Sequence, residues 1–314
     1  DALGVGTMFK YVQRRLILAV PTIFLTSIVV FLMLFLIPGD PAAIYIGDNT
    51  STPERLAQIR HEMGLDRPIY VQYVDFVWNA FHGDLGRSLQ TNRPVTTEIR
   101  SRLPNTIKLA VAAMVLGTIV GLALGLISGL KQNSIFDTLS MIVALFGISI
   151  PVFWLALLLI MLFAVRLHWF PATSQPGLRG LVLPAVSLAL LSAATLARIV
   201  RASVLEVLHQ EYLNTARAKG ISYAAVVFRH ALPNAIIPVI TVMGLQFGSL
   251  LSGAVITETV FARPGLGKLV VDSIQNKDLP VVQGVILVLA VIYILMNLLV
   301  DLSYALVDPR IRYD

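Results

Sequence analysis

Six long apolar runs constrain most strongly what this chain can fold into. A helix needs about 20 mainly apolar residues to cross about 30 Å of hydrocarbon. The runs lie at 16–37, 109–130, 138–165, 180–197, 236–257 and 281–300. The composition agrees with a membrane protein, because only 13% of the residues are charged against about 25% in soluble domains. We therefore expect an all-α integral membrane protein with six transmembrane helices.

The distribution of Lys and Arg predicts the orientation, because positively charged loops are retained in the cytoplasm. Lys10, Arg14 and Arg15 precede the first run. The segments on their side of the membrane carry more Lys and Arg than the short loops on the other side. The first group continues with Lys131, Arg198, Arg201, Arg217, Lys219, Arg229, Arg310 and Arg312, and the second consists of Arg166, Arg179, Arg263, Lys268 and Lys277. We expect cytoplasmic ends at 1–15 and 308–314, with one membrane domain over 16–307.

The loop at 38–108 then lies outside the cell, and its sequence predicts helices. Thr52 is a candidate N-cap, Pro53 suits the first helical position and Gly64 suits the end of that helix. A second amphipathic helix is expected to end near Gly83. Two interpretations remain open, a lid over the outer ends of the spans and a docking surface for an external partner.

The sequence offers no group for catalysis, metal binding or ATP binding. The five histidines form no metal-like pair, and there is no cysteine and no G-x-S-x-G elbow. The segment RPGLGKL resembles a phosphate-binding loop, but Ala262 replaces its first glycine and Leu269 its final Ser or Thr. An ion-driven carrier usually needs charged groups at mid-depth of its spans, and none lies near the centre of a run. We expect a protein that is not an enzyme and holds no cofactor of its own.

Two residue sets inside the runs suggest packing or a transport path. The second run carries glycines four residues apart on one helical face, which favours close packing of helices, with a backbone-lined substrate groove as the alternative. These are Gly117, Gly121, Gly125 and Gly129. The candidate path residues are Ser149, Gln246, Ser249 and Ser252, for which a packing role is equally open.

The segment 211–235, EYLNTARAKGISYAAVVFRHALPNA, is a polar insertion between two apolar runs on the cytoplasmic side. Glu211 suits the first turn of a short helix, Gly220 its end and Ser222 the cap of the next helix. Connections between packed helices usually take about 2–8 residues, and this one is longer. Its small residues Ala216 and Ala218 allow a partner's backbone to come close. The pattern favours a partner-binding knob over a hairpin that only links helices.

This segment resembles the EAA signature of permease subunits in ABC-type importers, in the variant of the dipeptide, oligopeptide, nickel and glutathione group. TARAKG stands for the alanine-rich part and Gly220 for the signature glycine, although Tyr212 and Leu213 replace two alanines of the generic pattern. Further matching stretches are PGDP (38–41), HGDLGRS (82–88), ETVFARPGLGKL (258–269) and DPRIRY (308–313).

The resemblance implies the type I importer permease fold in the bacterial inner membrane. The region 202–235 would couple transport to a separate ATPase. The expected ATPase contacts are Glu211, Tyr212, Thr215, Ala216, Arg217, Ala218, Lys219 and Gly220. Its partners would be a second, related permease, two cytoplasmic ATPase domains that bind ATP and Mg²⁺, and an external substrate-binding protein. Di- or oligopeptides are the expected substrates, with nickel or glutathione as the alternative in the same architecture and an ion-driven carrier or channel as the less favoured one.

Overall fold

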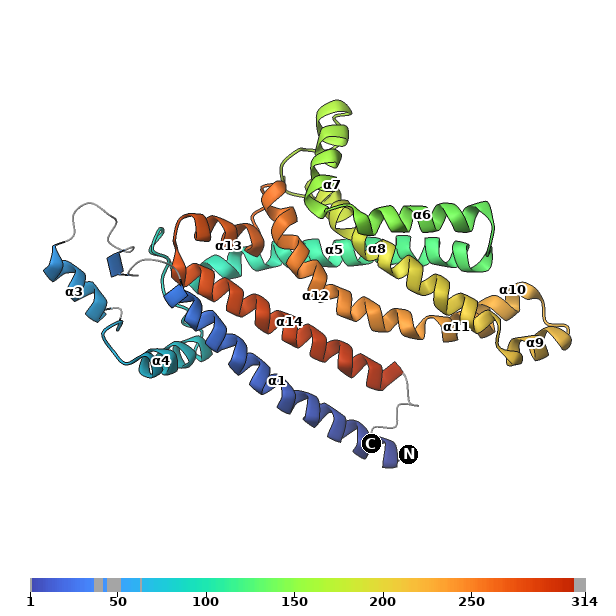
Figure 1. The fold of residues 1–314 in the computed structure, drawn as a ribbon, viewed down its shortest axis with the longest axis horizontal. Helices are drawn as coiled ribbons and strands as arrows, with labels where there is room; N and C mark the ends of the chain where they lie inside the picture. The colour runs from blue at the N-terminus through green and yellow to red at the C-terminus, as the bar shows by residue number, and fades with distance from the viewer. Residues whose placement is uncertain (1, 37–41, 44–51, 63, 308–314) are drawn as a thin grey trace. The chain divides into compact units, whose positions relative to one another are not determined.

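A computed structural model describes residues 2–36, 42–43, 52–62 and 64–307, and they form helices joined by turns (Figure 1). Within these residues the only β-pairing is an isolated bridge between Arg87 and Pro94. The stretches 38–41 and 308–313, and the C-terminal tail at 308–314, lie outside the described residues.

The helices are α1 (Ala2–Leu36), α3 (Pro53–Glu62), α4 (Ile69–Phe81), α5 (Val95–Leu130), α6 (Ile135–Ser149), α7 (Val152–Leu159), the π-helix η1 (Ile160–Arg166), α8 (Arg179–Leu208), α9 (Glu211–Ala218), α10 (Tyr223–Ala225), the π-helix η2 (Val226–Ala231), α11 (Leu232–Ala235), α12 (Ile237–Val260), α13 (Leu266–Gln275) and α14 (Leu279–Val307).

Apart from Ile37, which lies outside the described residues, the six predicted apolar runs lie in helices that are interrupted only at Ile150–Pro151 and at Ile236, which confirms the all-α membrane class. Among the described residues, α5, α8, α12 and α14 are each long and apolar enough to cross a membrane, and α1 contains a shorter apolar segment, Ile17–Met33. The third run differs from a straight span, because α6 and α7–η1 meet at an angle of 106°. Pro151 is the N-cap of α7, and the missing N–H of proline explains why the α6 helix does not continue through it.

The chain divides into two compact units, which are described separately. The first consists of Asp1–Val12, Thr106–Arg263 and Met296–Asp314, and the second of Gln13–Asn105 and Pro264–Leu295. In the first unit, the glycine face of α5 lies directly against α8. A Cβ on Gly121 would lie 2.7 Å from the Leu196 Cβ, and one on Gly125 would lie 2.5 Å from the Val200 Cβ. Only glycine fits at this distance between the two helices.

An ion pair between a buried carboxylate and a partly buried guanidinium ties α6 to α8 in the same unit. The Arg201 guanidinium donates from Nε and Nη2 to the two carboxylate oxygens of Asp137, at 2.7 and 2.9 Å. Ser128 Oγ and the Asn133 backbone N–H donate to the same carboxylate. The pairing compensates for the burial of the Asp137 carboxylate, whereas the Arg201 side chain keeps 28% of its surface exposed.

In the second unit, the two helices predicted for the external loop are present. The α3 helix begins at Pro53 and is followed by Gly64 with φ of +67°, and the α4 helix is followed by Gly83 with φ of +82°. Left-handed backbone of this kind ends helices and favours glycine. The α1 and α14 helices are linked where Gln283 Nε2 donates to the Val30 carbonyl at 3.3 Å.

Candidate functional site

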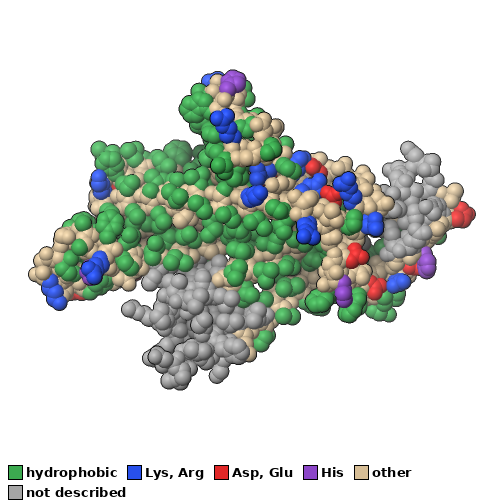
Figure 2. Space-filling view, turned by 180° about the vertical axis from the view of Figure 1, so that it is seen from behind, with side chains coloured by type: hydrophobic (Ala, Val, Ile, Leu, Met, Phe, Trp, Pro, Cys, Tyr) green, Lys and Arg blue, Asp and Glu red, His purple; other side chains and the backbone are tan. Residues whose placement is uncertain are grey.

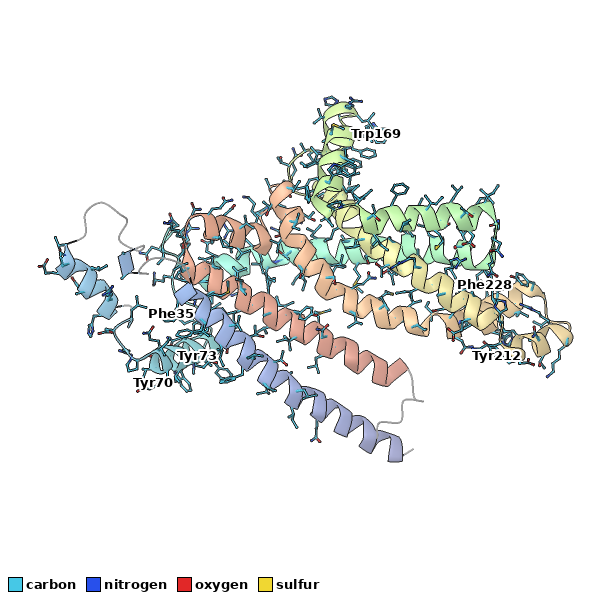
Figure 3. All side chains as sticks on the ribbon, in the orientation of Figure 1. Phe35, Tyr70, Tyr73, Trp169, Tyr212 and Phe228 are labelled. Atoms are coloured by element: carbon cyan, nitrogen blue, oxygen red, sulfur yellow. The ribbon has the colours of Figure 1, made fainter. Side chains whose placement is uncertain are left out.

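The coupling region, 202–235, forms the end of the first unit where α8 leads through three short helices and η2 into α12 (Figures 1 and 3). The predicted short helix is α9, which begins at Glu211 and ends at Ala218. The acidic residue in its first turn is favourable at the positive end of a helix dipole. The insertion therefore has secondary structure along most of its length and is not an extended linker.

Leu213 fixes α9 to the rest of the unit. Its side chain is completely buried in one apolar cluster with residues of α8, η2, α11 and α12. The cluster consists of Leu196, Val200, Val204, Val207, Leu213, Val226, Ala231, Ala235 and Val239. Since α9 shares a core with the ends of α8 and α12, a force on α9 is transmitted to both helices.

Gly220 ends α9 in a Schellman arrangement. The Gly220 N–H donates to the Arg217 carbonyl at 2.9 Å, and the Ile221 N–H donates to the Ala216 carbonyl at 3.3 Å. This motif needs a left-handed residue at the position of Gly220, whose φ is +79°. The Ser222 side chain then accepts a hydrogen bond from the Ala225 N–H. Both sequence predictions, the left-handed glycine and the serine cap, are confirmed.

A hydrogen-bond cluster joins three elements of the coupling region. Asn234 Nδ2 donates to the Tyr212 hydroxyl at 3.0 Å and to the His230 carbonyl at 2.8 Å, and the Tyr212 hydroxyl also donates to that carbonyl at 3.2 Å. The cluster links α9 to η2 and α11. It gives Tyr212 a structural contact within the chain while its ring stays 40% exposed.

The outer surface of the coupling region mixes charged, small and aromatic side chains. Seven of the eight predicted contact residues are exposed, and Ala216 packs partly against the apolar cluster. Arg217 lies over the Tyr223 ring at 5.9 Å, and Phe228 is 67% exposed. Figure 2 shows Lys and Arg side chains at the end of the unit formed by this region, next to the hydrophobic surfaces of the helices. Exposed aromatic and Arg side chains are typical of protein–protein contact surfaces.

The predicted path residues do not form one cluster. Gln246 of α12 faces α8, where its Oε1 accepts a hydrogen bond from Ser192, and its Nε2 is buried without a partner. Ser249 and Ser252 of α12 and Ser149 at the end of α6 are exposed. Because Gln246 is turned into the unit, the described residues bring only the three serines to a surface.

Sequence reasoning missed the residues that hold the site in place. Asn234 and Asp137 belong to no residue set that we selected, yet both join segments distant in sequence. A signal for Asp137 was available in the sequence. Asp137 directly precedes the third apolar run and Arg201 follows the fourth, so the two opposite charges could have been predicted to pair. No group of three or more His, Asp or Glu side chains suited to a metal ion occurs in the part of the chain that the structure describes.

Comparison with known proteins gives the same family for both halves of the chain. Residues 121–313 match the model of the binding-protein-dependent transport system inner membrane component, and residues 8–110 match the model of the N-terminal part of such membrane components. The chain is 43% identical to the di/tripeptide transport system permease protein DppB of Pseudomonas aeruginosa (strain UCBPP-PA14), covering 98% of this chain and 99% of the relative. It is 45% identical to the glutathione transport system permease protein GsiC of Escherichia coli (strain K12), covering 98% of this chain and all of the relative.

Solved structures share the fold at low sequence identity. The inward-facing MetNI methionine ABC transporter matches with a TM-score of 0.56 and 19% identity, over 67% of this chain and 96% of the matched chain. An amino acid ABC transporter matches with a TM-score of 0.52 and 20% identity, over 67% of this chain and 92% of the matched chain. At such identity the likeness shows the fold alone.

Proposed function

The chain belongs to the family of inner membrane components of binding-protein-dependent transport systems, and from this premise we propose that its coupling region transmits ATP-driven movement from a separate ATPase to the membrane helices during peptide import. The chain is a multi-pass permease subunit of an ABC importer and is not itself an enzyme. ATP and Mg²⁺ are bound and ATP is hydrolysed by the partner subunits.

The shared core of α9 with α8 and α12 is the observation that carries this proposal. Leu213 is completely buried there, so a partner that moves the exposed side of α9 moves two membrane helices with it. The exposed residues Arg217 and Lys219 offer charged contacts that suit a partner surface which rearranges in every cycle. Gly220 leaves open space beyond its Cα, which allows the partner's backbone to approach.

The test replaces Gly220 by Val in the assembled importer and measures ATP-dependent peptide uptake in proteoliposomes. We expect loss of uptake, because a branched side chain is strained at φ of +79° and fills the space at the partner surface. Gly177→Val is a matched control, since Gly177 has φ of +93° with open space around it and lies outside the coupling region. Normal uptake by a correctly assembled Gly220→Val complex would refute the coupling role.

For the substrate, we infer import of di- or oligopeptides, because relatives that share nearly the whole length of the chain are named for di/tripeptides and for glutathione, itself a short peptide. A second related permease, two ATPase domains and an external binding protein complete the transporter in this proposal. Uptake of labelled dipeptide, labelled glutathione and radioactive Ni²⁺ by the same proteoliposomes distinguishes the alternatives. Uptake of Ni²⁺ alone would exclude peptide import.

Orientation is also part of the proposal. The bias of Lys and Arg toward one side supports both termini in the cytoplasm of a bacterial cell, with the chain in its inner membrane. The coupling region then faces the ATP of the cytoplasm, and the loop at 38–108 faces the external binding protein. An ion-driven carrier is disfavoured because uptake by a member of this family depends on partner subunits.

A further inference from the structure

The α4 helix of the external loop has three distinct faces. Its first face carries Tyr73 and Phe76, which contact α1 through aromatic rings. Its second face carries Gln72, Asp75 and Asn79, which line a cavity of about 230 Å³. Its third face is exposed over more than three turns and consists of Tyr70, Val74, Trp78 and Phe81.

The contacts with α1 fix the depth of α4. The Tyr73 hydroxyl shares a hydrogen bond with Ser27 Oγ at 2.7 Å, and the Tyr73 ring packs edge-on against Phe24 and Phe31. Ser27 lies nine residues before the end of α1 at Leu36, which corresponds to about 13 Å along a helix axis. Figure 3 shows Tyr73 of α4 beside α1, near Phe35, with Tyr70 on the outer side of α4. The Tyr73 contact of α4 therefore lies alongside the apolar segment of α1 and not beyond its end.

The third face has the composition of a lipid-facing surface. Its residues are between 61% and 86% exposed, and none of them is charged. The only charged residue of α4, Asp75, is on the second face, where Arg67 Nη1 donates to it at 3.0 Å. Tyr and Trp are enriched where protein crosses the boundary between hydrocarbon and headgroups.

The α1 helix, on which α4 packs, also exposes large apolar side chains. Phe24, Leu25, Val29, Leu32 and Phe35 of α1 are all more than 40% exposed, and they belong to the apolar segment that is predicted to cross the membrane. The helix that carries the aromatic face thus packs against an apolar segment that is expected to cross the membrane. An external protein that covered this face would have to approach the bilayer closely.

We propose that α4 is an interfacial helix, with its face formed by Tyr70, Val74, Trp78 and Phe81 inserted into the lipid leaflet at the loop end of α1. Its polar face points away from the hydrocarbon and borders the cavity, and the aromatic contacts with Phe24 and Phe31 hold it at this depth. Such an amphipathic helix lies in the plane of the membrane with its apolar side about 5–10 Å below the headgroup boundary. The inference concerns the external loop and does not depend on the proposed coupling role.

Site-directed spin labelling tests the inference, because the chain contains no cysteine, so that one introduced cysteine is the only labelling site of this subunit once the partner subunits are also free of reactive cysteine. Val74→Cys places the label on the third face of α4, and Tyr70→Cys places a second label one turn earlier. Ala57→Cys on the polar, exposed α3 is the matched control in the same loop. The assembled importer is reconstituted in vesicles of phosphatidylethanolamine and phosphatidylglycerol, and collisions of the label with oxygen and with a water-soluble nickel chelate are measured.

We expect the labels at 74 and 70 to collide more with oxygen than with the nickel chelate, and the label at 57 to show the opposite order. More frequent collisions with the chelate at 74 and 70 would place the face in water and overturn the proposal. Low collision rates with both reagents would mean that a protein covers the face, such as the second permease, and would overturn it as well. Repeating the measurement with the external binding protein present distinguishes that partner, since its docking would lower both rates only after addition.

Discussion

Leu213 is the residue on which the position of α9 depends. The helix has eight residues, too few to be stable alone in water, and Leu213 is its only buried side chain. Its burial therefore keeps a short helix in place while the predicted ATPase contacts, Ala216 excepted, stay exposed. Other contacts of α9 with the chain, such as those of Tyr212, Arg217 and the partly buried Ala216, lie nearer its exposed surface.

We predict that Leu213→Ala destabilises the coupling region by about 2–5 kcal/mol, the usual range for truncation of a buried leucine. Trypsin should then cleave faster after Arg217 and Lys219 in the purified protein, and ATP-dependent uptake should fall. Leu213→Met is the control, because a change that conserves volume costs less than about 1.5 kcal/mol. Equal cleavage rates in Leu213→Ala and the unaltered chain would show that α9 does not depend on this anchor.

Contact between α5 and α8 is set by the glycine face of one helix and the branched side chains of the other. A Cβ on Gly117 would lie 3.0 Å from Ser192, whereas one on Gly125 would lie 2.5 Å from Val200 and 2.7 Å from the Ala197 carbonyl. A Cβ on Gly117 would also lie 3.1 Å from the Ala189 carbonyl, so backbone is involved at both positions, but the contacts at Gly125 are closer. The two positions therefore tolerate an added methyl group to different degrees.

We predict that Gly125→Ala lowers the stability of the protein by about 1–3 kcal/mol, as is usual for overpacking, and that Gly117→Ala has a smaller effect. Thermal unfolding of the two variants in the same detergent measures the difference. If the glycines served only a substrate groove, both variants would unfold like the unaltered chain and differ in uptake instead.

The ion pair between Asp137 and Arg201 is the second connection between elements that can be tested. Asp137 is 4% exposed, and its carboxylate receives hydrogen bonds from Arg201, Ser128 and the Asn133 backbone. Removing one member of a buried pair leaves the other charge uncompensated, whereas replacing both by apolar residues is often neutral.

We predict that Asp137→Leu destabilises the protein by about 1–3 kcal/mol, because it leaves the partly buried Arg201 guanidinium without its acceptor, and that the double variant Asp137→Leu/Arg201→Met is the more stable of the two. Equilibrium unfolding of these two variants and of Arg201→Met completes the double-mutant cycle. Additive effects of the single changes would indicate that the two charges do not stabilise each other.

At the scale of the whole molecule, the coupling region and the loop between η1 and α8 are predicted to lie on opposite sides of the membrane. Ala218 is exposed in the first, and Leu178 is 80% exposed in the second. Because the chain contains no cysteine, a single cysteine introduced at either position is the only one in this subunit that can be labelled.

We predict that a membrane-impermeant maleimide labels Ala218→Cys only in inside-out vesicles and Leu178→Cys only in intact spheroplasts, because the Lys and Arg bias places 202–235 in the cytoplasm. Permeabilised membranes, in which both positions should react, provide the control for access. Labelling of Ala218→Cys from outside would show that the orientation is the opposite of the predicted one. The coupling region would then lie on the other side of the membrane from a cytoplasmic ATPase.

The sequence by itself determined the class of the fold and the place of the coupling region. Runs of about 20 apolar residues leave few alternatives to membrane helices, since backbone polar groups must be satisfied within the segment. Local signals also sufficed at Gly220 and Ser222, where a left-handed glycine and a helix cap depend on neighbouring residues. The two helices of the external loop were predictable for the same reason.

Only the tertiary structure decided which distant residues meet. The partners of Asp137 and Asn234 come from other helices, and the apolar pattern of a membrane segment does not specify them, because lipid and protein neighbours favour similar side chains. The 106° angle after α6 was likewise not predictable. Pro151 indicates where the helix breaks, but the direction of the next helix depends on packing. The depth of α4 rests on the contact of Tyr73 with Ser27, two residues whose pairing depends on how the loop folds back along α1.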